Sequence, residues 1–495
     1  MVSEKVNISQ QVLVSQSSLS SARRSTQYLA ALIATIGGFI AGTCLAWTSP
    51  VDAAAILKTY GFSVSENEMA WIGSFMPLGA MVGSILTAAL VDRIGRKNLI
   101  LAIIIPCVIG WAVIAFAPST IVICAGRFLT GIAAGCYCIV VPLYTSEIAE
   151  KDIRGTLGTY FQLQITFGIL AVYILGSFVS AFWLTVFCGI VPFVFAAFML
   201  LLPETPYYHI LNGKFSQAQN SLAWFRGHHY DGKTELEIIQ KSIDDDAADK
   251  TPLLHAFGST AAKRGLVIGL GVMFLQQFSG CNAVIFYTKT IFSAAGATLN
   301  ADMSTVIIGI AQSISTYIST LVVDRLGRKI LLLVSIVVMG LSTFTLGLYF
   351  YLKDNVKTDV SGIGWLPLVS MSSFIIIFSL GFGPIPWMLM AEIFPSKIKG
   401  PACSLATLVN WLCVFLVTKL FPLLNSTVGI GPTFWCFTIC CTFGTAFVLF
   451  LVPETKGKTL LEVQEMLSGD SPHPSRPTNQ YAPGSAPFEA SKVRI

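Results

Sequence analysis

The sequence predicts an all-α protein that crosses a membrane twelve times, in two halves of six helices each. Three observations lead to this prediction. The chain of 495 residues is 54% hydrophobic and only 12% charged, with a mean hydropathy of +0.72 and a net charge of +5, whereas a soluble domain carries about 25% charged residues. Twelve apolar runs approach the length of about 20 residues that spans a bilayer as a helix. Charged motifs of the first half also recur in the second.

The apolar runs define the predicted domains. Lipid offers no hydrogen-bonding partner to the backbone, so each run is expected to form a helix. The runs cover residues 28–49, 69–91, 99–117, 120–143, 157–180, 183–203, 264–287, 302–323, 330–352, 364–391, 401–424 and 431–452. The predicted units are a cytoplasmic N-terminal segment (1–27), a six-helix bundle (28–205), a cytoplasmic helical insert (206–263), a second six-helix bundle (264–453) and a largely disordered cytoplasmic tail (454–495).

Basic residues predict which side of the membrane each loop faces. With the N-terminus inside, ten of them fall in short inner loops: Arg93, Arg96, Lys97, Lys151, Arg154, Arg325, Arg328, Lys329, Lys397 and Lys399. Three fall in outer loops: Lys58, Lys353 and Lys357. Because short positively charged loops stay in the cytoplasm, both termini and the insert are predicted to be cytoplasmic, in a multi-pass protein of the plasma membrane.

Three charged motifs occur once in each half, in the same order. "VDRIGRK" (91–97) returns as "VDRLGRK" (323–329), "SEIAEKDIRG" (146–155) as "AEIFPSKIKG" (391–400), and "PETP" (203–206) as "PETK" (453–456). This order indicates an internal duplication of six plus six spans. Two parallel halves of this kind enclose a substrate near the midplane of a transporter.

The repeated charges lie at the predicted cytoplasmic ends of helices. Glu147 with Arg154 is predicted to form one half of a cytoplasmic gate, and Glu392 with Lys399 to form the other. Exposed ion pairs contribute only about 0–1 kcal/mol each, so such a gate can break and reform. The alternative is that the charges only set the topology. The whole predicted set of gate and salt-bridge residues is Asp92, Arg96, Glu147, Arg154, Glu204, Asp324, Arg328, Glu392, Lys399 and Glu454.

Uncharged amides mark the predicted substrate site. The first span contains no acid, and the polar groups within the other spans are mainly Gln162, Gln164, Gln276, Gln277, Asn282, Gln312 and Asn410. Amides both donate and accept hydrogen bonds, which suits a neutral ligand covered in hydroxyl groups, and Trp387, Trp411 and Tyr287 can stack on a sugar ring. The alternative for any single amide is a bond between helices. "GFGPIPW" (381–387) and "QQFSGCN" (276–282) interrupt two spans and are predicted hinges.

The chain resembles the sugar porter family of the major facilitator superfamily, and within it the insect trehalose or glucose facilitators and the animal facilitative hexose carriers. The resemblance covers about residues 28–465 and rests on "GRFLTG" (126–131), "PLYTSEIAEKDIRG" (142–155), "QQFSGCNAVIFY" (276–287), "GPIPW…EIFP" (383–395) and "PETKGKTL" (453–460). It implies a major facilitator fold and an outer gate near Tyr287. It also implies sugar contacts from Gln162, Gln276, Gln277, Asn282, Gln312, Trp387 and Asn410.

Some positions depart from the family pattern. Proton-coupled relatives carry an Asp in the first span, where this chain has Cys44. Ser379 stands where the glucose carriers have a Glu, Phe286 replaces the first of a Tyr pair, and Lys399 replaces an Arg. Lys lacks the planar guanidinium of Arg, so a bidentate contact with a carboxylate is weakened at this position.

The predicted function is facilitative uniport of a neutral sugar, either a hexose such as glucose or the disaccharide trehalose, by a monomer in the lipid bilayer. A proton-coupled symporter and a transport-dead sugar sensor are the alternatives. No enzymatic activity, cofactor, metal or nucleic acid is expected, and the cysteines are expected to pack between helices. "GHHYDGKT" (227–234) matches a phosphate-loop pattern, but such a loop needs a preceding strand, so no nucleotide is expected either.

Overall fold

The computed structural model describes residues 23–150, 152–227, 230–248, 257–296, 300–458 and 460–468, and within these ranges the chain forms helices and loops and no strand. This confirms the predicted all-α class. The predicted tail beyond 468 and most of the predicted N-terminal segment lie outside the described residues. Twelve helices of the described chain are long and apolar enough to cross a membrane.

The first half contains six of these spans. They are α2 (Arg24–Ala34) with α3 (Ile36–Ala46), α5 (Glu66–Ile94), α6 (Arg96–Ala115), α7 (Thr120–Ile148), α8 (Arg154–Phe178) and α9 (Ala181–Leu200). The short helix α4 (Ala53–Tyr60) lies between the first two spans. Three helices of the predicted insert follow the sixth span: α10 (Pro206–Leu211), α11 (Phe215–Arg226) and α12 (Lys233–Ala248). The phosphate-loop look-alike therefore begins after a helix, α11, and not after a strand.

The second half contains the other six spans. The seventh span consists of α14 (Thr260–Phe278) and α15 (Cys281–Ala295), and the eighth is α16 (Ala301–Leu326). The ninth consists of α17 (Arg328–Phe350) and the π-helical turn η1 (Tyr351–Asn355), and the tenth of the short 3-10 turn η2 (Ser361–Ile363), α18 (Leu366–Leu380) and α19 (Ile385–Ile393). The last two are α20 (Ser396–Val428) and α21 (Ile430–Leu451). The helix α22 (Leu460–Ser468) follows the last span.

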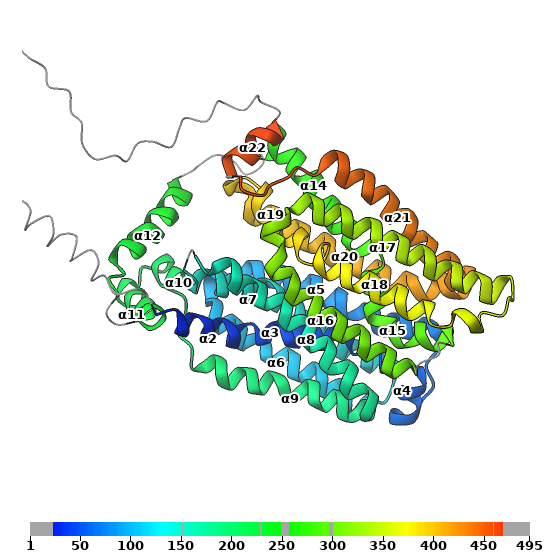
Figure 1. Cartoon of the computed structure of the whole chain (residues 1–495). Coiled ribbons are helices and arrows are strands. Elements are labelled where there is room, and N and C mark those ends of the chain that lie inside the picture. The colour runs from blue at the N-terminus through cyan, green and yellow to red at the C-terminus, as the bar shows by residue number, and fades with distance from the viewer. Residues whose placement is uncertain are drawn as a thin grey trace, which may run out of the picture.

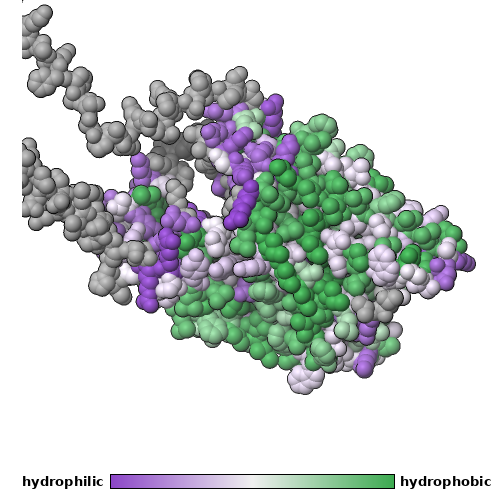
Figure 2. Space-filling model, in the orientation of Figure 1, coloured by the Kyte–Doolittle hydropathy of each residue, from purple (hydrophilic) through white to green (hydrophobic). Residues whose placement is uncertain are grey.

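The spans run side by side in one direction (Figure 1). We call the end that carries α10–α12 and α22 the inner end, and the end that carries α4 and η1 the outer end. The surface between the two ends is apolar, and polar residues gather at the inner end (Figure 2). Large apolar side chains such as Phe443, Phe450 and Ile105 are exposed on this surface, as expected for a face in contact with lipid.

Small residues allow close packing within the first half. Gly79 and Gly83 of α5 face the backbone of α7 so closely that an added Cβ would overlap the carbonyl oxygens of Phe128 and Ile132. Gly131 of α7 meets the α5 backbone in the same way. Lipid provides no hydrophobic force between spans, so helices there associate through such close packing.

Three of the spans are broken. The seventh breaks at Gly280, whose φ of +97° favours glycine, and the tenth breaks over residues 381–384. Both breaks were predicted from Gly and Pro. The first span also breaks, at Thr35 between α2 and α3, and this break was not predicted although Gly37 and Gly38 follow it closely.

Hydrogen bonds between the halves gather toward the outer end. Tyr173 of α8 donates to the Ile285 carbonyl of α15 (2.8 Å). Lys419 of α20 donates to Asn67 Oδ1 of α5 (2.8 Å) and lies 3.9 Å from the centroid of the Trp71 ring. The remaining bonds join Tyr173 to Thr288, Thr48 to Phe286, Lys289 to Ser49, and Ser313 to Thr166. None of the hydrogen bonds and ion pairs between described residues joins the halves at the inner end, so the polar contacts between the halves lie toward the outer end.

Candidate functional site

Four buried amides of the second half form one hydrogen-bonded cluster, which we call the amide cluster: Gln276, Gln277, Asn282 and Asn410. Gln276 Nε2 donates to the carbonyls of Phe382 (2.7 Å) and Gly383 (3.0 Å). Its Oε1 accepts from Asn410 (2.9 Å) and Gln277 (3.3 Å). Asn282 in turn donates to Gln277 Oε1. The two helix breaks make the cluster possible, because the break in the tenth span exposes the carbonyls that Gln276 reaches.

The amides differ in the capacity that they keep for a ligand. An amide has two donor hydrogens and an oxygen that accepts two bonds, and Gln276 uses all of these on protein partners. Gln277 uses one of its two donor hydrogens, on Gln276. Within the described chain the side-chain oxygens of Asn282 and Asn410 accept no hydrogen bond. Gln276 therefore positions the cluster, while the other three can also contact a ligand.

Three more polar atoms nearby are buried without a partner in the described structure: Gln312 Oε1, Ser379 Oγ and Trp411 Nε1. Trp411 follows Asn410 on α20, and Ser379 lies one turn before the carbonyls that hold Gln276. Gln312 lies on α16, which packs along α18 and bonds to it through Ser319 and the Leu380 carbonyl (3.1 Å). Unpaired buried polar atoms are costly, and these three lie on helices that carry the amide cluster or pack beside it. We call them the three orphan groups.

Gln162 and Trp387 are placed differently from the other predicted contacts. Gln162 is the one predicted contact from the first half, on α8, and its side chain is partly exposed. Trp387 is half-buried on α19 and packs against the apolar core. No hydrogen bond among the described residues links either side chain to the amide cluster. Gln164 lines an outward-facing groove between α2 and α8 rather than the interior.

Tyr287, the predicted outer gate, lies within α15 at the contact between the two halves. It has non-helical dihedral angles within α15, donates to the Thr418 carbonyl (2.8 Å) and stacks on Phe421 at a centroid distance of 5.4 Å. Its hydroxyl faces Gly73 of the first half, where an added Cβ would lie 2.8 Å away. Tyr287 therefore packs against both halves where they are closed together.

At the inner end of the first half, the predicted charges form a network around Arg96. Arg96 binds Glu147 (3.0 Å) and Asp92 (2.9 Å), and Glu147 also accepts from Thr205 Oγ1 (2.6 Å). Glu204 accepts from the backbone N–H of Lys97 (2.9 Å), at the start of α6, where the helix dipole favours a carboxylate.

The second half repeats this arrangement around Arg328. Arg328 binds Glu392 (3.1 Å), and Glu392 accepts from Thr455 Oγ1 (2.5 Å). Glu454 accepts from the backbone N–H groups of Arg328 (3.0 Å) and Lys329 (3.1 Å), at the start of α17. The side chain of Asp324 lies outside the described part.

In this structure the acid of each predicted gate set bonds to a base outside the set. Glu147 binds Arg96 and not Arg154, whose guanidinium donates to the Ala149 carbonyl (3.3 Å). Glu392 binds Arg328, and no ion pair between described residues links it to Lys399. The physical reason is distance along the helix ends: Arg96 and Arg328 begin the neighbouring helices and reach the acids directly.

Most of the chain matches one known protein family. A family model described as "Sugar (and other) transporter" matches residues 21–467. The chain belongs to this sugar transporter family. Its general function is therefore transport across a membrane, and the predictions of a transporter, of a multi-pass membrane protein and of no enzymatic activity are confirmed.

Similar proteins agree with this assignment. The transporter is 41% identical over 447 residues to a "Facilitated trehalose transporter Tret1" of Culex quinquefasciatus, covering 90% of this chain and 86% of that protein. It is 40% identical to a protein of the same name from Polypedilum vanderplanki, covering 90% and 88%. A solved structure of the major facilitator superfamily proton:xylose symporter XylE is similar with a TM-score of 0.74 and 26% identity, covering 90% and 99%. The predicted major facilitator fold is confirmed.

One buried charge was not singled out by sequence reasoning. Arg127 is fully buried in α7, where it donates to the carbonyls of Cys44 (2.7 Å) and Ile72 (3.3 Å) and lies 5.5 Å from the Trp47 ring centroid. No carboxylate of the described chain pairs with it. The signal was present, since Arg127 is the one charge inside the apolar run 120–143, and a charge within a span marks a functional position by default.

Proposed function

We propose that this transporter carries a neutral sugar by facilitated diffusion, with alternating access to a site at the amide cluster. The observation that carries the proposal is that the buried ligand-binding capacity is uncharged. Gln277, Asn282 and Asn410 retain donors or acceptors at the two helix breaks. A neutral hydroxyl-rich ligand satisfies such groups without bringing a charge into the membrane.

The environment of Arg127 supports transport without protons. A carboxylate beside this guanidinium would provide a group that binds and releases a proton during the cycle. Here Arg127 is held by two backbone carbonyls and an aromatic face, and Cys44 donates to the Thr130 carbonyl (3.8 Å). The relatives named as facilitated transporters fit this reading.

We further propose trehalose as the substrate, with a monosaccharide as the alternative. The free donors and acceptors of the amide cluster can form hydrogen bonds with one sugar ring. The three orphan groups, Gln312 Oε1, Ser379 Oγ and Trp411 Nε1, provide further unpaired atoms for a second ring. Ser379 is smaller than the Glu of the resembling glucose carriers, so it leaves more room. Two relatives are named as trehalose transporters.

The charged networks of the inner end are proposed to act as the inner gate. In this structure the strong pairs, Arg96 with Glu147 and Arg328 with Glu392, hold the helices of each half together. Arg154 and Lys399 have no acid partner among the described residues here. When the inner end closes, these two bases are positioned to form the weak pairs between halves that a reversible gate needs.

The basic residues of the short loops support an inner end that faces the cytoplasm. We therefore propose that both termini and α10–α12 are cytoplasmic, in a protein of the plasma membrane that functions as a monomer. Addition of an impermeant protease to intact cells tests the orientation, since it should leave a C-terminal tag uncut.

Counterflow in proteoliposomes of purified protein tests the proposed transport. Vesicles loaded with unlabelled trehalose should accumulate labelled trehalose, without a pH gradient and without a response to a protonophore. Collapse of the uptake by the protonophore would contradict uniport, and absence of any flux would favour a transport-dead sensor. Competition by glucose, fructose and maltose ranks the substrates.

Substitution of Ser379 tests the second-ring site. Ser379→Glu should lower kcat/KM for trehalose by about tenfold or more, or 1.4 kcal/mol, while glucose transport is kept or improved. Ser379→Ala is the matched control and should change trehalose transport by a few fold at most. An equal loss for both sugars would show that position 379 serves only the structure.

A further inference from the structure

One charged residue inside a span of the second half has no part in the sugar site or in the inner networks. Lys419 is the only charge within the apolar run 401–424, and a charge within a span marks a functional position by default. It lies on the last third of α20, which ends at Val428 at the outer end. Basic residues set the orientation of a membrane protein from its inner loops, so topology does not explain a lysine near the outer end.

The ammonium group of Lys419 is held by two residues of the first half. Its Nζ donates to Asn67 Oδ1 (2.8 Å) and lies 3.9 Å from the centroid of the Trp71 ring. Asn67 and Trp71 are one turn apart on α5, so their side chains lie on the same side of that helix. The ammonium is therefore bound at two points, by an amide oxygen and by the negative face of an indole ring.

The contact contains no carboxylate, although Glu66 and Glu68 flank Asn67 in the sequence. Glu68 accepts hydrogen bonds from the backbone N–H and the hydroxyl of Ser65 (2.9 and 2.7 Å), at the start of α5. Within the described chain Lys419 forms no ion pair. A neutral acceptor holds an ammonium less tightly than a carboxylate does, so a contact of this kind can break and reform in every transport cycle.

The same turn of α20 is also bound by the predicted outer gate. Tyr287 donates to the carbonyl of Thr418, the residue before Lys419, and its ring stacks on that of Phe421. The hydroxyl of Tyr287 also faces Gly73 of α5. Lys419 and Tyr287 belong to the same half, so movement of α5 away from that half would break both contacts together.

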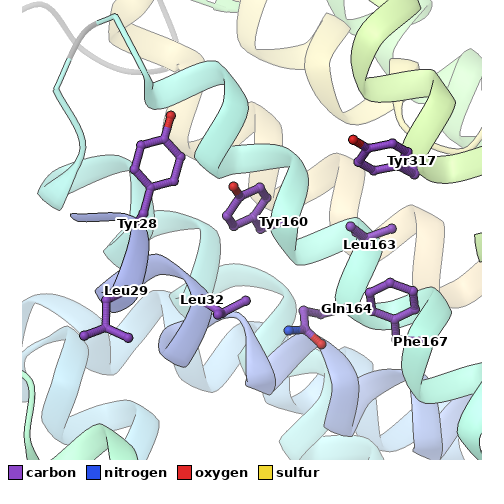
Figure 3. Close-up of a pocket in the computed structure, with 8 residues that line it drawn as sticks. All are labelled: Tyr28, Leu29, Leu32, Tyr160, Leu163, Gln164, Phe167 and Tyr317. Atoms are coloured by element: carbon purple, nitrogen blue, oxygen red, sulfur yellow. The ribbon is translucent and has the colours of Figure 1, made fainter. Parts of the chain in front are cut away.

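The halves also meet along α8 and α16, where the contact is of a different kind. Ser313 of α16 donates to the Thr166 carbonyl of α8 (3.4 Å). Nearer the inner end, Tyr317 of α16 and Leu163 and Phe167 of α8 line an apolar groove (Figure 3). Of the hydrogen bonds that join described residues of the two halves, only the one from Lys419 uses a charged side chain.

We propose that Lys419, Asn67 and Trp71 form an outer latch, which holds the two halves together at the outer end and sets the fraction of empty transporters that are open to the outside. The proposal rests on alternating access. A contact made in only one of two arrangements shifts the population toward that arrangement, and a sugar that arrives from outside binds only the other. Lys419 is therefore a positioning residue, which acts without touching the sugar.

Two substitutions that change the latch in opposite directions test it. Lys419→Met keeps the length of the side chain and removes the ammonium, so the ratio of outward-open to outward-closed molecules should rise about fivefold. Asn67→Asp keeps the shape of the side chain and offers the ammonium a carboxylate, so this ratio should fall about threefold. Glu66→Gln changes a neighbouring exposed charge by the same amount; it is the matched control and should leave the ratio unchanged.

Single-molecule energy transfer in proteoliposomes of the full-length protein measures this ratio. Dyes at Ser180 and Asn355, exposed residues at the outer ends of the two halves, report opening as a longer distance. They should be attached through unnatural amino acids, because Cys436 is exposed and would also react with thiol dyes. Unchanged distances in both variants, or shifts in the same direction, would overturn the latch.

A double variant separates a latch from a lysine that only extends toward water. When Lys419→Met is already present, Asn67→Asp should leave the distances unchanged, because the new carboxylate has no ammonium to bind. An effect of Asn67→Asp that persists without Lys419 would show that position 67 acts on the start of α5 and would overturn the pairing. These distances require neither sugar nor flux, so their outcome is separate from that of counterflow, which tests the proposed function.

Discussion

The two inner networks share one bonding pattern but differ in burial. In the first half, the side chains of Arg96 and Glu147 are 3% and 9% exposed. In the second half, the equivalent Arg328 and Glu392 are 12% and 27% exposed. A charge pair that is shielded from water depends on its partner far more than a hydrated pair does. The ion pair of this motif therefore stabilises the inner end of the first half more than the equivalent pair stabilises the inner end of the second half.

The pKa values of the two helix-capping acids, Glu204 and Glu454, reflect the same difference in burial between the halves. Burial raises the pKa of Glu204 above its usual value of 4.5, in spite of hydrogen bonds from Thr205 and Lys97. Burial also acts on Glu454, but backbone N–H groups of Lys456, Arg328, Lys329 and Thr455 outweigh it and lower the pKa of that carboxyl. The halves differ in their deeper parts too. The first half buries the charge of Arg127, whereas the second buries neutral amides.

The largest expected effect is on the stability of the first half. Glu147→Ala leaves Arg96 buried with only Asp92 as an acid partner, so the free energy of unfolding should fall by about 3–5 kcal/mol. Glu392→Ala should cost only about 1–2 kcal/mol, between the values for exposed and buried pairs. Denaturation in detergent measures both. Equal losses would show that burial does not distinguish the two networks.

The amide cluster offers the next largest effect. Gln276→Ala removes four hydrogen bonds and leaves the carbonyls of Phe382 and Gly383 unpaired, so both stability and transport should fall, the former by about 1–3 kcal/mol. Gln277→Ala should lower kcat/KM by about tenfold, or 1.4 kcal/mol, with little loss of stability. A thermal shift assay beside counterflow separates the two. If Gln277→Ala destabilised the protein as much as Gln276→Ala, the division of roles would fail.

A substitution that places a carboxylate beside Arg127 tests how the buried charge of the first half affects transport. Cys44→Asp should make trehalose uptake depend on external pH, because the new acid pairs with Arg127 only when it is ionised. Cys44→Asn, a neutral residue of similar size, is the control and should leave uptake insensitive to pH. Counterflow at several pH values measures this. A pH response of the wild type itself would contradict the proposed uniport.

The smallest expected effect is the pH dependence of the two capping acids. Glu204 has a raised pKa, so its ionised form opposes folding, and its contribution to stability improves as pH falls through that raised pKa toward 4.5. Glu454 has a lowered pKa, so its stabilising contribution is present above 4.5 and is lost as pH falls through the lowered value. Melting temperatures of Glu204→Gln and Glu454→Gln from pH 7 to pH 3 should therefore diverge from wild type with opposite slopes.

Much of the fold was predictable because the membrane restricts it. The twelve runs, the duplication and two of the three helix breaks followed from apolar length, repeated motifs and Gly or Pro. The break at Thr35 was not, since it depends on packing: Gly38 and Gly42 just beyond it lie against the α8 backbone. The role of the amides as a sugar site stays a prediction, and the hydrogen bonds that join four of them could not be read from the sequence.

The sequence by itself determined the class of protein and the spans, and it suggested the residue types of a candidate site, because hydropathy, charge counts and motifs are local properties of the chain. Only the tertiary structure decided which partners these residues take. It tied Gln276 to a broken helix, paired Glu147 with Arg96 rather than Arg154, and buried Arg127 without an acid. Such outcomes depend on distances between helices that are far apart in the chain, and on how much water remains around each charge.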